Sequence, residues 1–133
     1  MPTQISPMLA VVDAGAAIEF YRAAFGATVR WQIETAVAEL EIDGAAVFLA
    51  ESSPTSDSRA PSVLGATSVR IELFVDDPPA VFRRAVAAGA TVRSEVAVFD
   101  YPNSGPRRFT KLEQGSVLDP SGHIWLIGKL HYA

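Results

Sequence analysis

Three residues whose side chains could recognise a small molecule alternate along one apolar run of the chain. Arg70, Glu72 and Phe74 are separated by apolar residues within the run 69–75. Because successive side chains of a β-strand point to opposite faces, these three would share one face. A guanidinium, a carboxylate and an aromatic ring on one face favour a binding surface for a small molecule. The same pattern is also typical of the solvated face of a half-exposed sheet, so both interpretations remain open.

Further aromatic and basic residues could line such a surface. Trp31 and Phe99 could stack on a flat ligand, with ordinary core positions as the alternative. The stretch 100–108 is a long connection that carries Tyr101 and Arg108. Long connections of this kind often act as lids or binding edges. These residues therefore join the candidates for a ligand site.

Other classes of chemistry lack the residues that they need. The chain has no cysteine, which excludes disulfides and thiolate metal sites. Its two histidines are His123, for which a structural role in a turn is expected, and His131, which we expect to be exposed. Neither Ser116 nor Ser121 has an evident histidine partner. No phosphate-binding glycine loop, Walker motif or G-x-S-x-G nucleophile motif is found.

Composition and charge are typical of an ordinary globular domain. The 133 residues are 49% hydrophobic and 20% charged, and a chain of this length can bury a working core. The formal net charge of −4 disfavours a nucleic-acid partner. No apolar stretch reaches the roughly 18 residues needed to span a bilayer, and no signal peptide is recognised. We therefore expect no membrane partner and a cytoplasmic location.

An internal repeat organises the elements that must position these residues. Residues 11–30 and 74–93 align without a gap at an offset of 63, and nine of the twenty positions are identical. The identities include Gly-Ala-Thr-Val-Arg at 26–30 and again at 89–93. Each copy predicts an apolar strand followed by a helix with an apolar stripe.

Capping residues bound the two predicted helices. Asp13 and Asp76 stand where a helix N-terminus favours a side-chain acceptor and a negative charge. Gly26 and Gly89 stand where a left-handed C-cap is expected. The helices are thus predicted to begin and end at equivalent positions of the repeat.

Three strands are predicted after each helix, so the unit β-α-β-β-β occurs twice. Asp43-Gly44 and the stretch 119–122 supply the turns before the last strand of each unit. The unit's first strands are predicted at 7–12 and 69–75, and the others at 28–35, 37–42, 45–51, 91–99, 108–117 and 123–129. We expect one domain over 1–133, with module one at about 4–52, a connector at about 53–67 and module two at about 68–130.

This repeated unit resembles the vicinal oxygen chelate superfamily of glyoxalase I, bleomycin-resistance proteins and extradiol dioxygenases. The resemblance covers nearly the whole chain. It is carried by Ile-Glu-Phe-Tyr at 18–21, Phe-Gly-Ala at 25–27 and Asp-Pro-Ser-Gly-His-Ile-Trp at 119–125. It implies an α+β fold in which two tandem βαβββ modules form a curved, cleft-bearing mixed sheet with helices on the outer face.

Metal-binding members of this superfamily place His, Gln or Glu at four cleft positions, one in the first and one in the last strand of each module. None of the corresponding residues here is a usual ligand of a divalent metal, and an arginine would repel one. The resemblance thus implies a site without metal or other cofactor, unless Glu51 and Glu72 supply carboxylates after a shift in register. By resemblance, the four positions fall at Ser6, Leu49, Arg70 and Leu126.

Resemblance to the bleomycin-resistance branch implies a metal-free binding protein that sequesters a hydrophobic or aromatic small molecule, such as an antibiotic. In that branch two chains pair, so a homodimer is expected. One alternative is a divalent-metal-dependent lyase, isomerase or dioxygenase of the same superfamily, and another is an interaction module without a ligand. No catalytic residue is predicted. The predicted ligand-binding residues are Trp31, Leu49, Arg70, Glu72, Phe74, Tyr101, Arg108 and Leu126.

Overall fold

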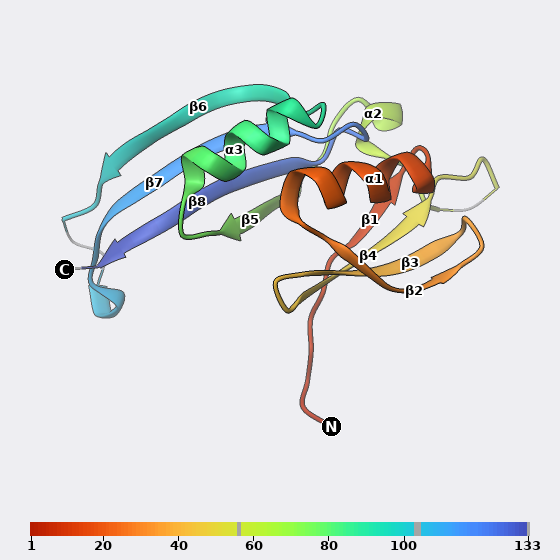
Figure 1. The fold of residues 1–133 in the computed structure, drawn as a ribbon, viewed down its shortest axis with the longest axis horizontal. Coiled ribbons are helices and arrows are strands. Elements are labelled where there is room, and N and C mark those ends of the chain that lie inside the picture. Colours follow the sequence, from red (N-terminus) through yellow and green to blue (C-terminus); the bar gives the residue numbers. More distant parts are fainter. Residues whose placement is uncertain (56, 103–104, 133) are drawn as a thin grey trace.

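The computed structural model describes residues 1–55, 57–102 and 105–132 and contains the β-α-β-β-β unit twice (Figure 1). No helix among these residues has the length and apolar character needed to cross a membrane. The elements are β1 (Met8–Val11), α1 (Ala14–Phe25), β2 (Thr28–Ile33), β3 (Val37–Ile42), β4 (Ala45–Glu51), α2 (Pro61–Leu64), β5 (Arg70–Phe74), α3 (Pro78–Ala87), β6 (Thr91–Asp100), the 3-10 turn Gly105–Arg107, β7 (Phe109–Leu118) and β8 (Ile124–Tyr132).

The two modules form sheets with the same strand order. The first sheet has the order β1-β4-β3-β2 and the second has the order β5-β8-β7-β6. In each sheet the first strand of the module pairs in parallel with the last strand, and the remaining pairs are antiparallel. This matching topology confirms the predicted repeat and the predicted α+β fold class.

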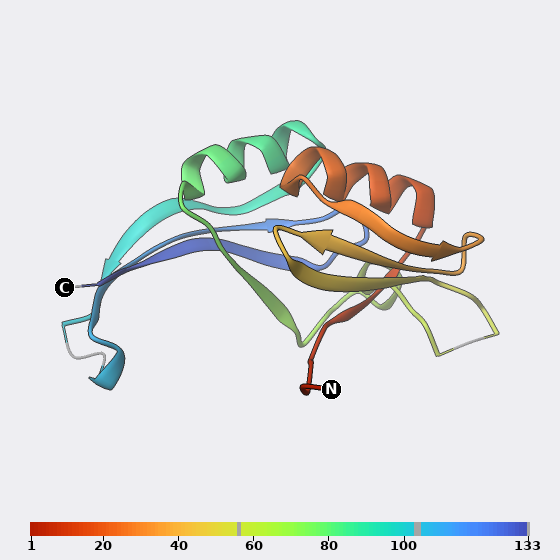
Figure 2. The same ribbon diagram turned by 60° about the horizontal axis from the view of Figure 1, so that its bottom comes forward.

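Helices α1 and α3 lie side by side over one face of the two sheets (Figure 2). The buried core fills the layer between helices and sheets. In β3, for example, Ala38, Leu40 and Ile42 are buried, whereas the intervening side chains are only partly covered. The sheet face that points away from α1 and α3, called the open face below, carries the other half of each strand's side chains.

The cap residues of α1 are the predicted ones, whereas those of α3 differ from the prediction. Asp13 caps α1 by accepting a hydrogen bond from the Ala16 amide, and Gly26 adopts a left-handed conformation with φ of 70°. The cap of α3 is Asp77 rather than Asp76. The prediction was one residue early because prolines occupy the first two positions of α3, where their fixed φ suits a helix start.

The end of α3 also departs from the prediction. Ala88 is the C-cap in a right-handed conformation, and Gly89 follows it with φ of 117°. Gly89 is therefore in a region that L-residues avoid, although it lies one position beyond the cap.

A turn in module two connects the two modules. The Asp119 carboxylate, which is 5% exposed, accepts hydrogen bonds from the Tyr21 hydroxyl at 2.5 Å and from the Trp125 indole at 3.0 Å. His123 Nε2 lies 2.7 Å from the Ala10 carbonyl, which confirms a structural role for this histidine. The segment 119–123, named the inter-module turn, thus fixes α1 and β1 against β8.

Candidate functional site

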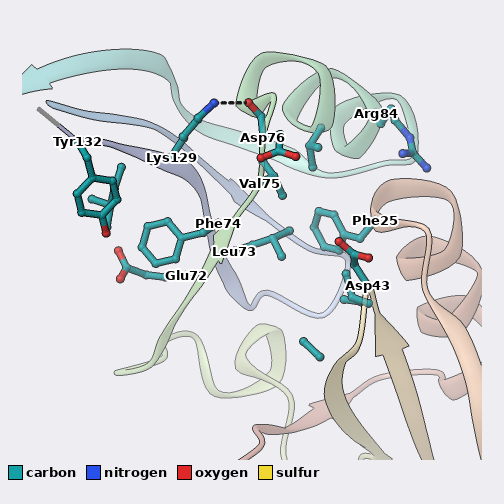
Figure 3. Close-up of a pocket in the computed structure, with 14 residues that line it drawn as sticks. Phe25, Asp43, Glu72, Leu73, Phe74, Val75, Asp76, Arg84, Lys129 and Tyr132 are labelled. Carbon is teal, nitrogen blue, oxygen red and sulfur yellow. Dashed lines mark hydrogen bonds between the residues drawn. The ribbon is translucent and has the colours of Figure 1, made fainter. Parts of the chain in front are cut away.

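Strand β5 places three predicted site residues on the open face. Arg70, Glu72 and Phe74 are exposed, whereas Ile71 and Leu73 are partly buried and pack against the core. In Figure 3, Glu72 and Phe74 lie on the side of Tyr132, and Leu73 points toward Phe25. The alternation inferred from the sequence therefore describes the real orientation of these side chains.

A small polar hollow surrounds two of these residues. Leu126 of β8 is the register partner of Glu72 in β5. The side-chain amide of Gln114 donates a hydrogen bond of 3.2 Å to the Glu72 carboxylate. The hollow has a volume of about 540 Å³ and is lined by Ser68, Val69, Arg70, Glu72, Gln114 and Leu126.

A second, more apolar hollow adjoins the first. It has a volume of about 550 Å³ and lies between β1, α2 and the chain that enters β5. Its apolar lining includes Met8 and Leu64, and it shares Ser68 and Val69 with the polar hollow. A ligand with a polar head and an apolar body could therefore occupy both hollows at once.

A third hollow, larger than these two, lies on the other side of Glu72, around the free edge of β5 (Figure 3). Its volume is about 750 Å³. Phe74 and Tyr132 contribute aromatic rings, whereas Lys129 and Asp76 contribute polar groups. The Lys129 ammonium donates to the Asp76 backbone carbonyl at 3.2 Å, so these two polar groups already have a hydrogen-bond partner within the protein.

Leu49 does not lie on the open face, and the expectation that it lines the cleft is wrong. It is 0% exposed and belongs to the core beside its register partner Leu9. A shift of one residue along a strand moves a side chain to the opposite face. The open-face position of β4 is Phe48, whose ring lies 6.0 Å from that of Trp31.

Trp31 lies on the open face of module one rather than in the core. It is 41% exposed, and its indole N–H donates to Glu39 at 2.7 Å. Register pairs place Trp31, Glu39, Phe48 and Met8 in one row across the sheet. Phe99 is likewise exposed, so the core interpretation of both aromatic residues is wrong.

An ion-pair cluster accompanies this row. Arg30 contacts Glu41 at 2.5 Å and Glu39 at 2.6 Å. Hydrogen bonds to Glu41 and then to Glu39 raise the pKa of the Arg30 guanidinium. The hydrogen bond from Arg30 is the main cause that lowers the pKa of Glu39. The charges of this sheet face are therefore largely paired with one another.

Tyr101 and Arg108 lie on the connection between β6 and β7 and line none of the three hollows. The Tyr101 ring lies 5.7 Å from that of Phe109, which is the register partner of Tyr132. Arg108 has a positive φ of 53°. These two predicted site residues are thus separate from Arg70, Glu72 and Leu126, which share one hollow.

Comparison with known proteins identifies the family. The model of the glyoxalase-like domain matches residues 7–126. The chain belongs to the glyoxalase-like domain family. It is 38% identical to an uncharacterized protein of Mycobacterium bovis over 133 residues, covering 94% of this chain and 82% of that protein. A Mycobacterium tuberculosis protein is also 38% identical, and the match covers 94% of this chain and 73% of that protein.

Solved structures share the fold of this glyoxalase-like domain. TioX from Micromonospora has a TM-score of 0.67 and 26% identity, covering 96% of this chain and 98% of its own. A glyoxalase-related enzyme from Fulvimarina pelagi has a TM-score of 0.66 and 20% identity, covering 96% of this chain and 88% of its own. These likenesses agree with the two-module architecture described above.

The donor set of this glyoxalase-like domain does not fit a divalent metal. Of the four positions implied by resemblance, Arg70 and Leu126 face the polar hollow but offer no ligand atom, and Leu49 is in the core. Glu51 and Glu72 were the possible substitutes: the Glu51 carboxylate accepts a hydrogen bond of 2.9 Å from the Ala14 amide at the start of α1, whereas Glu72 accepts one of 3.2 Å from Gln114 in the polar hollow. Nowhere in the described ranges do three His, Asp or Glu side chains form a metal-binding group.

Several residues of the hollows were not predicted from the sequence. Gln114 could have been found only from the pairing register of β7 and β8, which local patterns do not fix. Ser68 and Val69 fall within the predicted module two but immediately precede β5 in the structure, and neither was predicted to line a site. Finding Met8 required knowing which side chains of β1 reach the open face, and in the structure Leu9 and Val11 are the buried ones.

Proposed function

We propose that this glyoxalase-like domain is a binding protein that holds a small aromatic or apolar molecule beside β5 without a metal. The observation that carries the proposal is the pair of adjoining hollows, one polar around Arg70 and one apolar beside Met8. A mostly apolar pocket with a few placed polar groups is the usual form of a small-molecule site. Sequestration of an antibiotic would be one use of such a site, because it requires affinity and no bond chemistry.

The proposal includes a homodimer. Within one chain α1 and α3 do not cover the open faces, and these faces expose Trp31, Met8 and Phe74. Burying apolar surface of this kind favours association. A second copy that covers the open faces would also turn the shallow hollows into an enclosed site.

The test is a thermal-shift screen of the purified chain with polycyclic and glycopeptide antibiotics and with simple aromatic compounds, each with and without EDTA. We expect at least one compound to raise the melting temperature equally in both conditions, because binding to the native state stabilises it. A stoichiometric Zn, Ni, Mn or Fe content, with binding lost on chelation, would overturn the metal-free site. A screen in which no compound shifts the melting temperature would overturn the binding function.

A further inference from the structure

We propose that the natural ligand is an acid, with its carboxylate paired to Arg70 and an adjacent hydroxyl or ammonium group donating to Glu72. This inference rests on the proposed binding function and specifies the ligand class for the same site. It follows from four features: the charge of Arg70, the incomplete hydrogen bonding of Glu72, their spacing, and the apolar hollow next to them.

Arg70 has no carboxylate partner in the described structure, as is also true of Arg83, but unlike Arg83 it lines the polar hollow. Arg22 pairs with Glu19 at 2.8 Å, and Arg30 pairs with two glutamates. The Arg70 guanidinium lines the polar hollow without an ion pair. A guanidinium presents a planar set of donors that matches a carboxylate with two parallel hydrogen bonds.

Glu72 retains accepting capacity toward the same hollow. Within the described residues Glu72 accepts one hydrogen bond, from Gln114, and a carboxylate has about four acceptor positions. Glu72 also places a negative charge near any anion bound to Arg70. An acid without a hydrogen-bond donor would therefore be repelled, whereas an acid with a neighbouring donor would gain a second contact.

The spacing explains why the two side chains leave room for a ligand head group. Arg70 and Glu72 are two residues apart on one face of β5, a distance of about 6.6 Å along a strand. They form no ion pair with each other within the described part of the chain. A carboxylate with a hydroxyl or ammonium group one or two bonds away can contact both.

The apolar hollow determines the rest of the ligand. It joins the polar hollow at Ser68 and Val69 and continues toward Met8 and Leu64. Its volume of about 550 Å³ is large enough for a fused two-ring body. The ligand class is thus an apolar, preferably aromatic, acid with a donor group next to the carboxylate.

Isothermal titration calorimetry with three probes tests this inference: 3-hydroxy-2-naphthoate, 2-naphthoate and 2-naphthol. We expect the hydroxy acid to bind the wild-type chain most tightly. Arg70→Gln should weaken hydroxynaphthoate binding by about tenfold or more, the effect of losing a charge-assisted pair, and change 2-naphthol binding less than about twofold. Glu72→Gln should reduce the preference for the hydroxy acid over 2-naphthoate.

The control is Arg83→Gln, which removes an equal charge from an exposed position of α3 outside the three hollows. It should leave all three affinities unchanged, and circular dichroism melts should show that each variant folds. Equal binding of 2-naphthol and hydroxynaphthoate, or equal effects of Arg70→Gln and Arg83→Gln, would overturn the acid ligand but leave the binding function intact. If the two acids do not bind while neutral aromatic compounds raise the melting temperature, the acid ligand is wrong and the binding function stands. If no compound binds in either experiment, both proposals are wrong.

Discussion

At the scale of single residues, the most constrained group is the carboxylate of Asp119. It is buried and accepts four hydrogen bonds, from Tyr21, from Trp125 and from the backbone amides of Ser121 and His123. Burial, followed by the nearby charge of Asp119, raises the pKa of the Tyr21 phenol. The folded state therefore retains the Tyr21 proton at a pH where the unfolded chain releases it.

Tyr21→Phe should alter the dependence of stability on alkaline pH. In the wild type, the unfolded state binds fewer protons above about pH 10, so the free energy of unfolding should fall by about 1 kcal/mol between pH 10 and pH 11 from this group. The variant should not show this decrease in the free energy of unfolding between pH 10 and pH 11. It should also be destabilised by about 1–3 kcal/mol at pH 7, because Asp119 loses a buried hydrogen-bond donor. Urea unfolding at both pH values measures this, and parallel pH slopes for the two proteins would contradict it.

The sequence predicted some of these residue environments and not others. The structural role of His123 was expected from its turn, and the orientation of Arg70 and Glu72 followed from strand alternation. The Tyr21 hydroxyl bond could not be predicted, because Asp119 lies 98 residues away in the sequence. Leu49 was assigned to the wrong face because its position was found by counting residues along the chain. An error of one residue in such a count reverses the face to which a strand side chain points.

At the scale of elements, the repeat predicted the succession of strands and both helices along the chain, but not the details of their ends. Strand β6 extends to Asp100 and β8 to Tyr132, each beyond its predicted end. Helix α2 forms within the predicted connector, where four residues give too short a pattern to recognise. Differences of one to three residues arise because side-chain caps and tertiary pairing decide where an element stops.

Two glycine substitutions should have opposite effects on stability. Gly89→Val should destabilise the fold by about 1–3 kcal/mol, because Gly89 has φ of 117° and a β-branched residue resists that conformation. Gly15→Ala should stabilise it by about 0.5–1 kcal/mol, since Gly15 lies in α1 and an added Cβ meets only Asp13 Oδ1 at an ordinary 3.4 Å. Thermal melts of both variants provide the measurement, and shifts of the same sign would show that one backbone assignment is wrong.

At the scale of the whole molecule, the two sheets leave their open faces without a covering layer. Helices α1 and α3 both lie on the opposite side (Figure 2). The row that contains Trp31, Phe48 and Met8 therefore presents apolar side chains to solvent in an isolated chain. The sequence could not show this, because alternation alone does not reveal which of two faces another chain would cover.

Phe48→Asp should convert the proposed homodimer into a monomer. The substitution places an unpaired charge in the apolar row that we expect a second copy to bury, which is strongly unfavourable. Sedimentation velocity should give about twice the chain mass for the wild type and the chain mass for the variant. Val86→Asp, on the helix side of the molecule, is the matched control and should remain dimeric. A wild-type chain that sediments as a monomer at all accessible concentrations would refute the homodimer.

The inter-module turn holds the two halves of the chain together by non-covalent bonds. Ser121 Oγ accepts a hydrogen bond of 3.1 Å from the Val12 amide, 109 residues earlier, and Tyr21 reaches Asp119 across a similar separation. The halves are thus joined by non-covalent bonds in addition to the peptide connector that links them. Cleavage of the connector by a protease at residues 53–55 should leave a two-fragment particle that elutes like the intact protein. Two separately expressed halves would each carry an incomplete core and would be stable only as a reassembled pair.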